Sequence, residues 1–267
     1  MYDLFDSDTP LIGMVHLPPL PGAPGYGGSR DDLRATALAD ALALTDNGFD
    51  GILVENYGDA PFYPDDVPKH VVAELTATVR ELSLAVDCPF GVNVLRNDAE
   101  AALAVAAATG GSFVRVNVHT GASVTDQGVL EGNAYETLRL RDRLDADVAV
   151  LSDVDVKHAT SLGERDVHAV ATETIDRGLA DGLVVSGPAT GEPAESEQLL
   201  TVLDARDDAT RDVPVLLGSG VTADNARDLL ELADGAMVGT AVKRDSETSN
   251  PVDPERVRSL VAASQTN

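Results

Sequence analysis

The sequence is short of several residue types, and each shortage excludes a class of protein. Its 267 residues include one cysteine, no tryptophan and 4% aromatic residues. The single cysteine, Cys88, cannot form an intramolecular disulfide or a multi-cysteine metal site. No apolar run approaches the roughly 20 residues that span a bilayer. The acidic N-terminus lacks the pattern of a signal peptide. We therefore expect a cytoplasmic protein with no integral membrane segment.

Basic residues are also scarce. Lys and Arg number 19 against 45 Asp and Glu, so the net charge is −26. A surface this acidic repels nucleic acids and anionic lipids, so neither is an expected partner. The charge, the rarity of lysine and the low aromatic content favour a protein adapted to a very salty cytoplasm, where molar salt shortens the screening length to about 3 Å. An ordinary acidic cytosolic protein is the alternative.

The chain does contain a regular alternation of apolar runs and helical segments. Strand-length apolar runs lie at Leu11–His16, Gly51–Glu55, Phe90–Leu95, Phe113–Val118, Val148–Val156, Gly182–Val185, Val213–Leu217 and Ala236–Gly239. Helical periodicity fills the intervals, and no linker divides the chain. Eight such units predict one α/β domain over residues 1–267, a (β/α)8 TIM barrel. An open doubly wound sheet is the alternative, but no Gly-x-Gly-x-x-Gly follows the first strand.

The last two predicted strands end in turns of small residues. Barrels often bind phosphate there, because glycines let backbone N–H groups approach the anion and a helix N-terminus adds positive charge. The predicted phosphate-binding residues are Gly218, Ser219, Gly220, Gly239, Thr240 and Lys243. For Lys243 the alternative is a solvated surface lysine.

Polar residues at the ends of the other strands are candidates for substrate contacts, because barrel chemistry lies at the carboxyl ends of strands. Arg115, Asn117 and His119 alternate, so a strand would place them on one face, lining the barrel. An internal hydrogen-bond network is the alternative. The long loop after them predicts a lid or substrate-binding segment. The predicted substrate-binding residues are His16, Asn56, Asn93, Arg115, Asn117, His119, Asp126, Gln127 and Ser186.

Carboxylates and one lysine provide the candidates for proton transfer. Alternation places Asp153, Asp155 and Lys157 on one face, and Glu55 ends the second predicted strand. Such a cluster shifts pKa values and can supply a general acid or base. Its carboxylates could also hold a divalent cation, with His158 as a further ligand; no other cofactor is expected. A structural ion-pair network is the alternative.

Several longer motifs resemble the BtpA/SgcQ family. They are Ile52–Phe62, Gly91–Asp98, Val114–Val118, Val124–Gly128, Asp153–Ala159, Val184–Gly187, Gly218–Thr222 and Val238–Thr240. The resemblance runs nearly end to end and implies a barrel of the ribulose-phosphate-binding type. A member from salt-loving archaea fits the composition. For such members the resemblance implies a role in nucleoside or pentose-phosphate breakdown, including phosphorolysis of a nucleoside.

Residues and resemblance together favour an enzyme. Its expected partners are a small phosphate ester, or a nucleoside with inorganic phosphate, and a second copy of the chain in a homo-oligomer. Isomerase or lyase chemistry also fits, because a neutral Lys157 could form a Schiff base. The alternative is a non-catalytic assembly factor, since the family takes its name from a cyanobacterial member implicated in photosystem I accumulation.

Overall fold

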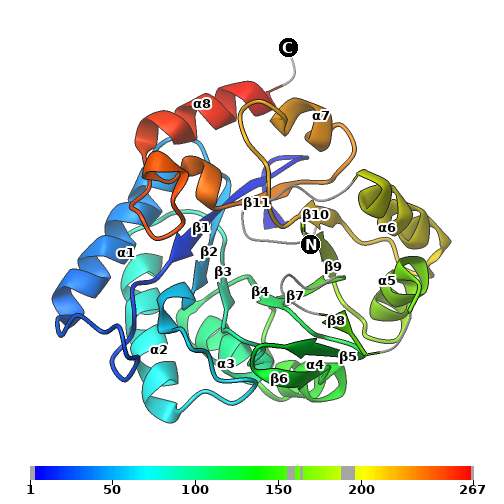
Figure 1. Cartoon of the computed structure of the whole chain (residues 1–267), viewed down its shortest axis with the longest axis horizontal. Coiled ribbons are helices and arrows are strands. Elements are labelled where there is room, and N and C mark those ends of the chain that lie inside the picture. Colours follow the sequence, from blue (N-terminus) through cyan, green and yellow to red (C-terminus); the bar gives the residue numbers. More distant parts are fainter. Residues whose placement is uncertain (1–3, 155–159, 163–164, 188–195, 266–267) are drawn as a thin grey trace.

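Eight parallel strands close into a barrel. The computed structural model describes residues 4–154, 160–162, 165–187 and 196–265. Its barrel strands follow one another in the order β1-β11-β10-β9-β7-β4-β3-β2. Seen down the barrel, the strands form the centre and the helices surround them (Figure 1). The predicted (β/α)8 fold is confirmed.

The barrel is built from short strands and longer helices. The strands are β1 (Leu11–His16), β2 (Gly51–Glu55), β3 (Phe90–Asn93), β4 (Phe113–Val116), β7 (Ala149–Asp153), β9 (Gly182–Val185), β10 (Val215–Leu217) and β11 (Ala236–Val238). The helices are α1 (Arg30–Thr45), α2 (Lys69–Ser83), α3 (Ala99–Thr109), α4 (Ala134–Arg143), α5 (Val167–Asp176), α6 (Ser196–Asp208), α7 (Ala226–Leu230) and α8 (Pro254–Ser264). Several predicted strands extended further than the observed ones, because apolar residues that flank the paired segments, such as Val94, Leu95 and Val213, were counted with them.

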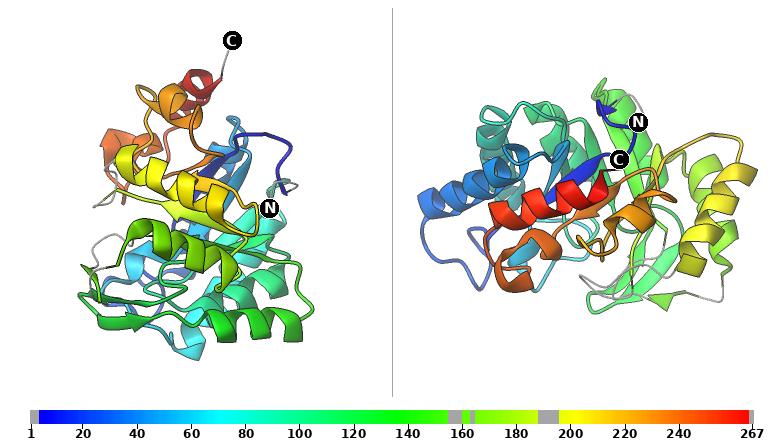
Figure 2. Two further views of the ribbon diagram at one scale, coloured as in Figure 1. Left: turned by 90° about the vertical axis from the view of Figure 1, so that its right-hand side faces the viewer. Right: turned by 90° about the horizontal axis from the view of Figure 1, so that it is seen from above.

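Short polar side chains begin several of the helices. Ser29 accepts a hydrogen bond from the backbone N–H of Asp32, and Asp98 accepts one from that of Ala101. Asp253 caps α8, whose first residue is Pro254. These caps satisfy backbone donors that lack an intrahelical partner. Helices α5 and α6 pack side by side on one flank of the barrel (Figure 2).

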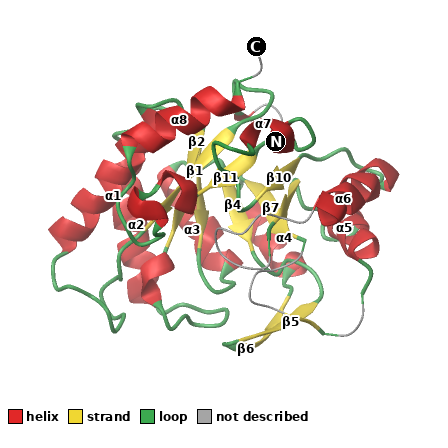
Figure 3. Cartoon of the chain, turned by 45° about the horizontal axis from the view of Figure 1, so that its top comes forward, coloured by secondary structure: helices red, strands yellow, loops and turns green. Residues whose placement is uncertain are grey.

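The predicted loop after β4 forms a β-hairpin instead. Strands β5 (Ala122–Thr125) and β6 (Gly128–Glu131) pair antiparallel, and β8 (Thr160–Ser161) pairs with β5. Gly128 at the turn has a φ of 107°, which glycine adopts without strain. The hairpin lies at the lower edge of Figure 3. The described residues also form the 3-10 helices η2 (Tyr57–Asp59), η3 (Thr240–Val242) and η4 (Arg244–Ser246).

Along β1, β2, β4, β7 and β9 the barrel interior changes from apolar to polar side chains, and β10 and β11 lead into glycines. A cluster of buried apolar side chains that includes Met14, Leu53, Phe113, Leu151, Val184, Leu216 and Met237 fills its lower part. Two residues further along the same strands stand His16, Glu55, Arg115, Asp153, Ser186, Gly218 and Gly239. Because alternate residues of a strand share a face, these side chains project into the same interior. The polar layer therefore lies at the carboxyl ends of the strands.

The helices that the structure describes include none long and apolar enough to cross a membrane.

Candidate active site

A cavity of about 640 Å³ opens at the carboxyl ends of the barrel strands. Its volume is within the range of small-molecule sites in proteins. The sequence-predicted residues that line it are His16, Glu55, Arg115, Asn117, Asp126, Asp153, Gly218, Ser219, Gly220, Gly239 and Thr240. The fold thus brings residues from both ends of the chain into one cavity.

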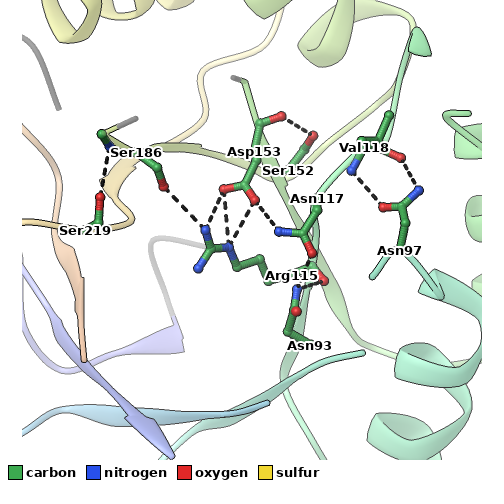
Figure 4. A network of polar contacts seen from close by, with 10 residues as sticks. Asn93, Asn97, Arg115, Asn117, Val118, Ser152, Asp153, Ser186 and Ser219 are labelled. Atoms are coloured by element: carbon green, nitrogen blue, oxygen red, sulfur yellow. Dashed lines mark hydrogen bonds and ion pairs between the residues drawn. The ribbon is translucent and has the colours of Figure 1, made fainter. Parts of the chain in front are cut away.

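Asp153 lies at the centre of a buried polar network (Figure 4). Arg115 donates to its carboxylate through Nη2 at 2.8 Å and Nε at 3.2 Å, and Asn117 donates through Nδ2 at 2.6 Å. Burial by itself lowers the pKa of the Arg115 guanidinium, but Asp153 and Glu55 oppose this and raise that pKa above its ordinary value. Arg115 therefore stays charged and holds Asp153 in one orientation.

Two further residues support this network from below and beside it. The Asn93 amide donates to the carbonyl of Arg115 at 2.8 Å and to Asn117 Oδ1 at 3.3 Å. Ser186 Oγ accepts a hydrogen bond from Arg115 Nη2 at 3.4 Å. Both side chains are almost fully buried. Asn93 and Ser186 therefore position Arg115 and Asn117 and do not line the cavity themselves.

His16 and Glu55 form a second pair on the opposite wall. The register of β1 and β2 places the two residues side by side, and His16 Nε2 lies 3.8 Å from Glu55 Oε1. The ring of Tyr57, in η2, lies 4.8 Å from the imidazole at 41°. His16 and Glu55 are 7% and 9% exposed. The pair can hold or transfer a proton inside the cavity.

The segments Gly218–Thr222 and Gly239–Thr240, called the cradle below, form another part of the lining. A Cβ on Gly218 would lie 2.3 Å from Ser186 Oγ, so only glycine fits there. Gly220 has a φ of 73°, and the Asn225 amide donates to its carbonyl. The helices that follow are only one turn long, so the backbone N–H and hydroxyl groups of the cradle offer anion contacts without a long helix dipole.

Lys243 lies elsewhere, and its predicted role in the phosphate site is not supported by its surroundings. Its side chain is 1% exposed and Nζ donates to Asp40 Oδ2 at 2.6 Å. Burial lowers the pKa of this amine, opposed by the charge of Asp40. Lys243 is therefore a buried structural cation paired with Asp40 of α1, neither the predicted phosphate ligand nor a surface lysine.

Asn56 and His119 also point away from the cavity lining. Asn56 accepts from the backbone N–H of Leu95 at 2.7 Å and so ties two strand-end loops together. The alternation that was expected to bring His119 inward fails because β4 ends at Val116. His119 Nε2 instead contacts the Gly178 carbonyl at 2.8 Å. Burial lowers the His119 pKa, partly opposed by that contact.

The hairpin supplies one residue to the cavity. Asp126, in the turn between β5 and β6, lines it, and Gln127 Nε2 donates to Asp126 Oδ2 at 2.7 Å. Asp155 and Lys157 were predicted to stand beside Asp153. Both lie outside the described residues, as does His158.

Sequence reasoning missed Arg96 as a site residue. It lines the cavity and is 9% exposed. Burial lowers the pKa of its guanidinium, opposed chiefly by Asp153, Glu55 and Asp126. The signal that could have found it is its position directly after a polar strand end, in the same pattern that selected Asn93.

One group of described side chains has the spacing of metal ligands, and it lies outside the cavity. His168 on α5 faces Asp204 and Asp208 on α6, with ligand atoms within 4.8 Å of one another. A divalent cation near Asp153 stays a prediction, and Arg115 already neutralises that carboxylate.

A match to a family model shows which protein family the chain belongs to. The model of the BtpA family matches residues 7–266. The chain belongs to the BtpA family. A BtpA-family relative in Synechocystis, named photosystem I biogenesis protein BtpA, is 44% identical over 263 residues, covering 98% of this chain and 90% of the relative. An uncharacterised protein of Thermococcus kodakarensis is 46% identical over 252 residues, covering 94% of each.

Solved structures agree with the fold of this BtpA-family chain. A tryptophan synthase chain of Mycobacterium tuberculosis superposes with a TM-score of 0.62 at 19% identity, covering 97% of this chain and 94% of the other. A thiamine phosphate pyrophosphorylase of Pyrococcus furiosus gives 0.56 at 15% identity, covering 96% of each. At these identities the comparison establishes a shared barrel fold.

Proposed function

We propose that this protein is an enzyme that binds a pentose together with phosphate, either as a phosphorylated sugar or as a nucleoside with inorganic phosphate. The observation that carries the proposal is a single cavity in which the cradle and the two buried acidic residues Glu55 and Asp153 face the same space. Glycine-rich turns at this end of a barrel are suited to phosphate, and buried carboxylates to proton transfer.

Residues on different walls of the cavity have different proposed roles. The cradle holds the phosphate through backbone N–H groups and the hydroxyls of Ser219 and Thr240. Arg115 and Asn117, both fixed on Asp153, contact the pentose hydroxyls. Glu55 exchanges the proton, with His16 beside it. In phosphorolysis of a nucleoside the bound phosphate attacks the anomeric carbon of the pentose, the bond to the base breaks, and the base leaves with that bond's electron pair and gains a proton.

A turnover screen in molar salt tests this proposal. Purine and pyrimidine nucleosides are each supplied with inorganic phosphate, pentose phosphates are supplied alone, and free base, consumed phosphate and isomerised sugar are measured. Turnover is expected for one class. Glu55→Gln keeps the size of the side chain and removes its charge, so we expect it to lower kcat by about a hundred-fold or more.

His168→Gln is the matched control for the screen. It removes a titratable residue that also faces carboxylates, but on α5 outside the cavity. Its turnover should equal that of the unmodified protein. Absence of turnover with every compound, and of any thermal stabilisation by phosphate or by pentose phosphates, would contradict the proposal.

The name of the Synechocystis relative supports a second candidate, a role in photosystem I biogenesis. The exposed apolar side chains Val124 and Val129, which face each other across the hairpin, offer a surface for a protein partner. The two candidates separate in the screen, because an assembly factor has no need to bind a phosphate ester.

A further inference from the structure

The cradle has no charged side chain of its own. The backbone N–H of Gly218 donates to the Val185 carbonyl and that of Thr222 to Asn225 Oδ1, so the cradle's contacts to an anion come from its other backbone N–H groups and its three hydroxyls. Lys243, which the sequence suggested as the cation, is bound to Asp40. At the Gly218 end of the cradle, Arg115 Nη2 lies 3.3 Å from the position of a Cβ on Gly218, but this guanidinium is paired with Asp153. Anions bind more strongly when at least one donor is ionised, so a cation is also expected at the Gly239 end.

His16 lies against the cradle. Strand β1 pairs with β11 so that Gly13 is opposite Val238. This register places His16, the last residue of β1, beyond the level of Gly239. A Cβ on Gly239 would lie 2.9 Å from His16 Cε1 and 3.4 Å from Met14 Cβ. A side chain at position 239 would therefore push the imidazole away. Cε1 is the ring carbon between the two nitrogens over which an imidazolium spreads its charge.

Glu55 lies on the other side of the same ring. His16 Nε2 lies 3.8 Å from Glu55 Oε1, so the carboxylate attracts an imidazolium and opposes the cost of burying its charge. Among the described residues, the titratable group from η2 that faces His16 is Tyr57, whereas the turn after β11 brings the uncharged Gly239 against the ring. Arg96 and Asp126 line the same cavity, and Arg96 interacts electrostatically with Glu55.

We propose that His16, kept as an imidazolium by Glu55, is the charged group at the Gly239 end of the phosphate subsite and binds the anion there. This inference rests on the proposed function, because it places the phosphate at the cradle. Protonation of His16 would also make the affinity of the subsite for anions depend on pH. The subsite binds a dianion tightly while His16 is protonated and loses affinity as rising pH removes that proton.

Sulfate is the probe that isolates this effect. Its charge stays at −2 across neutral pH, whereas inorganic phosphate itself gains a proton in the same range. The dissociation constant of sulfate is measured by titration calorimetry between about pH 5.5 and about pH 8.5, a range that spans histidine titration, at constant ionic strength in potassium chloride. We expect the affinity to fall by about ten- to a hundred-fold over this range, the worth of one charge-assisted hydrogen bond.

Three variants assign the effect to His16. His16→Gln should bind sulfate as weakly at low pH as the unmodified protein does at high pH, with no dependence on pH. Glu55→Gln should move the fall in affinity to lower pH, because the imidazolium loses its carboxylate. Gly239→Ala should weaken binding by displacing the ring, and it tests the same contact if His16→Gln fails to fold. His168→Gln, which removes a histidine paired with carboxylates on the outer surface, should reproduce the unmodified profile.

The outcomes distinguish the two proposals. Sulfate binding that is independent of pH, or unchanged in His16→Gln and Gly239→Ala, would overturn the role of His16 and leave the phosphate site in place. If neither sulfate, inorganic phosphate nor any pentose phosphate binds the unmodified protein at any pH, the proposed function itself fails, and the role of His16 fails with it.

Discussion

At the scale of single residues, Arg115 and Asp153 show how charge is kept inside the barrel. Their side chains are 6% and 2% exposed, and Arg115 Nη2 and Nε lie 2.8 Å and 3.2 Å from Asp153 Oδ1. Ion pairs this deeply buried gain little net stability over an apolar core, but they are costly to break because one charge is left without a partner. The pair is therefore retained for what it positions: the Asn117 amide and the Arg115 guanidinium at the cavity.

Asp153→Asn tests this argument. The change keeps the volume of the side chain and leaves the Arg115 charge uncompensated, so we expect the free energy of unfolding to fall by about 3–5 kcal/mol. Denaturation by guanidinium chloride measures it. Asp207→Asn is the matched control, because Asp207 pairs with Arg206 at the surface, where an ion pair contributes little. An equal, small effect in both variants would contradict the burial of the Arg115 charge.

At the scale of elements, one carboxylate fastens the segment after β11 onto α1. Asp40 accepts from Lys243 Nζ through Oδ2 and from the Val252 backbone N–H at 2.8 Å through Oδ1. The segment between Lys243 and Val252 contains η4. The residues just before this segment include Gly239 and Thr240 of the cradle. Asp40 thereby helps to position one side of the proposed phosphate site, although it does not line the cavity.

Lys243→Met separates this structural role from direct phosphate binding. The unpaired Asp40 charge should lower the free energy of unfolding by about 3–5 kcal/mol, and an Asp40→Leu and Lys243→Met double variant should recover part of that loss. Sulfate affinity of the double variant should equal that of the unmodified protein, because Lys243 does not line the cavity. Weak sulfate binding with unchanged stability would instead restore Lys243 as a ligand.

At the scale of the whole molecule, the net charge of −26 opposes the compact state. The 45 acidic side chains repel one another most strongly when little salt is present. We predict that the thermal unfolding midpoint rises as potassium chloride increases from about 0.1 M to about 2 M, because the screening length falls from about 10 Å to a few ångströms. Scanning calorimetry measures the midpoint, and a midpoint that stays constant across this series would contradict adaptation to high salt.

Much of the architecture was predictable, because it depends on local patterns. Apolar runs at regular intervals predicted the barrel, and the exact bounds of β1, β2 and β9 followed from where those runs begin and end. The hairpin at Ala122–Glu131 was predicted as a loop, since a strand pair of four residues on each side hardly differs from a loop in its hydrophobic pattern. Arg96 and Lys243 were misjudged because the order of residues does not say which way a side chain after a strand will turn.

The sequence by itself determined the fold and the polar layer at the strand ends. Both follow from periodicity: alternate residues of a buried strand share a face, and the residue two places beyond each interior apolar side chain must enter the same space. Only the tertiary structure decided which polar groups meet. Lys243 reaches Asp40, 203 positions away, and His16 comes to lie between Glu55 and Gly239. Such contacts arise when the barrel closes and brings β1 against both β2 and β11, and no local pattern in the chain specifies them.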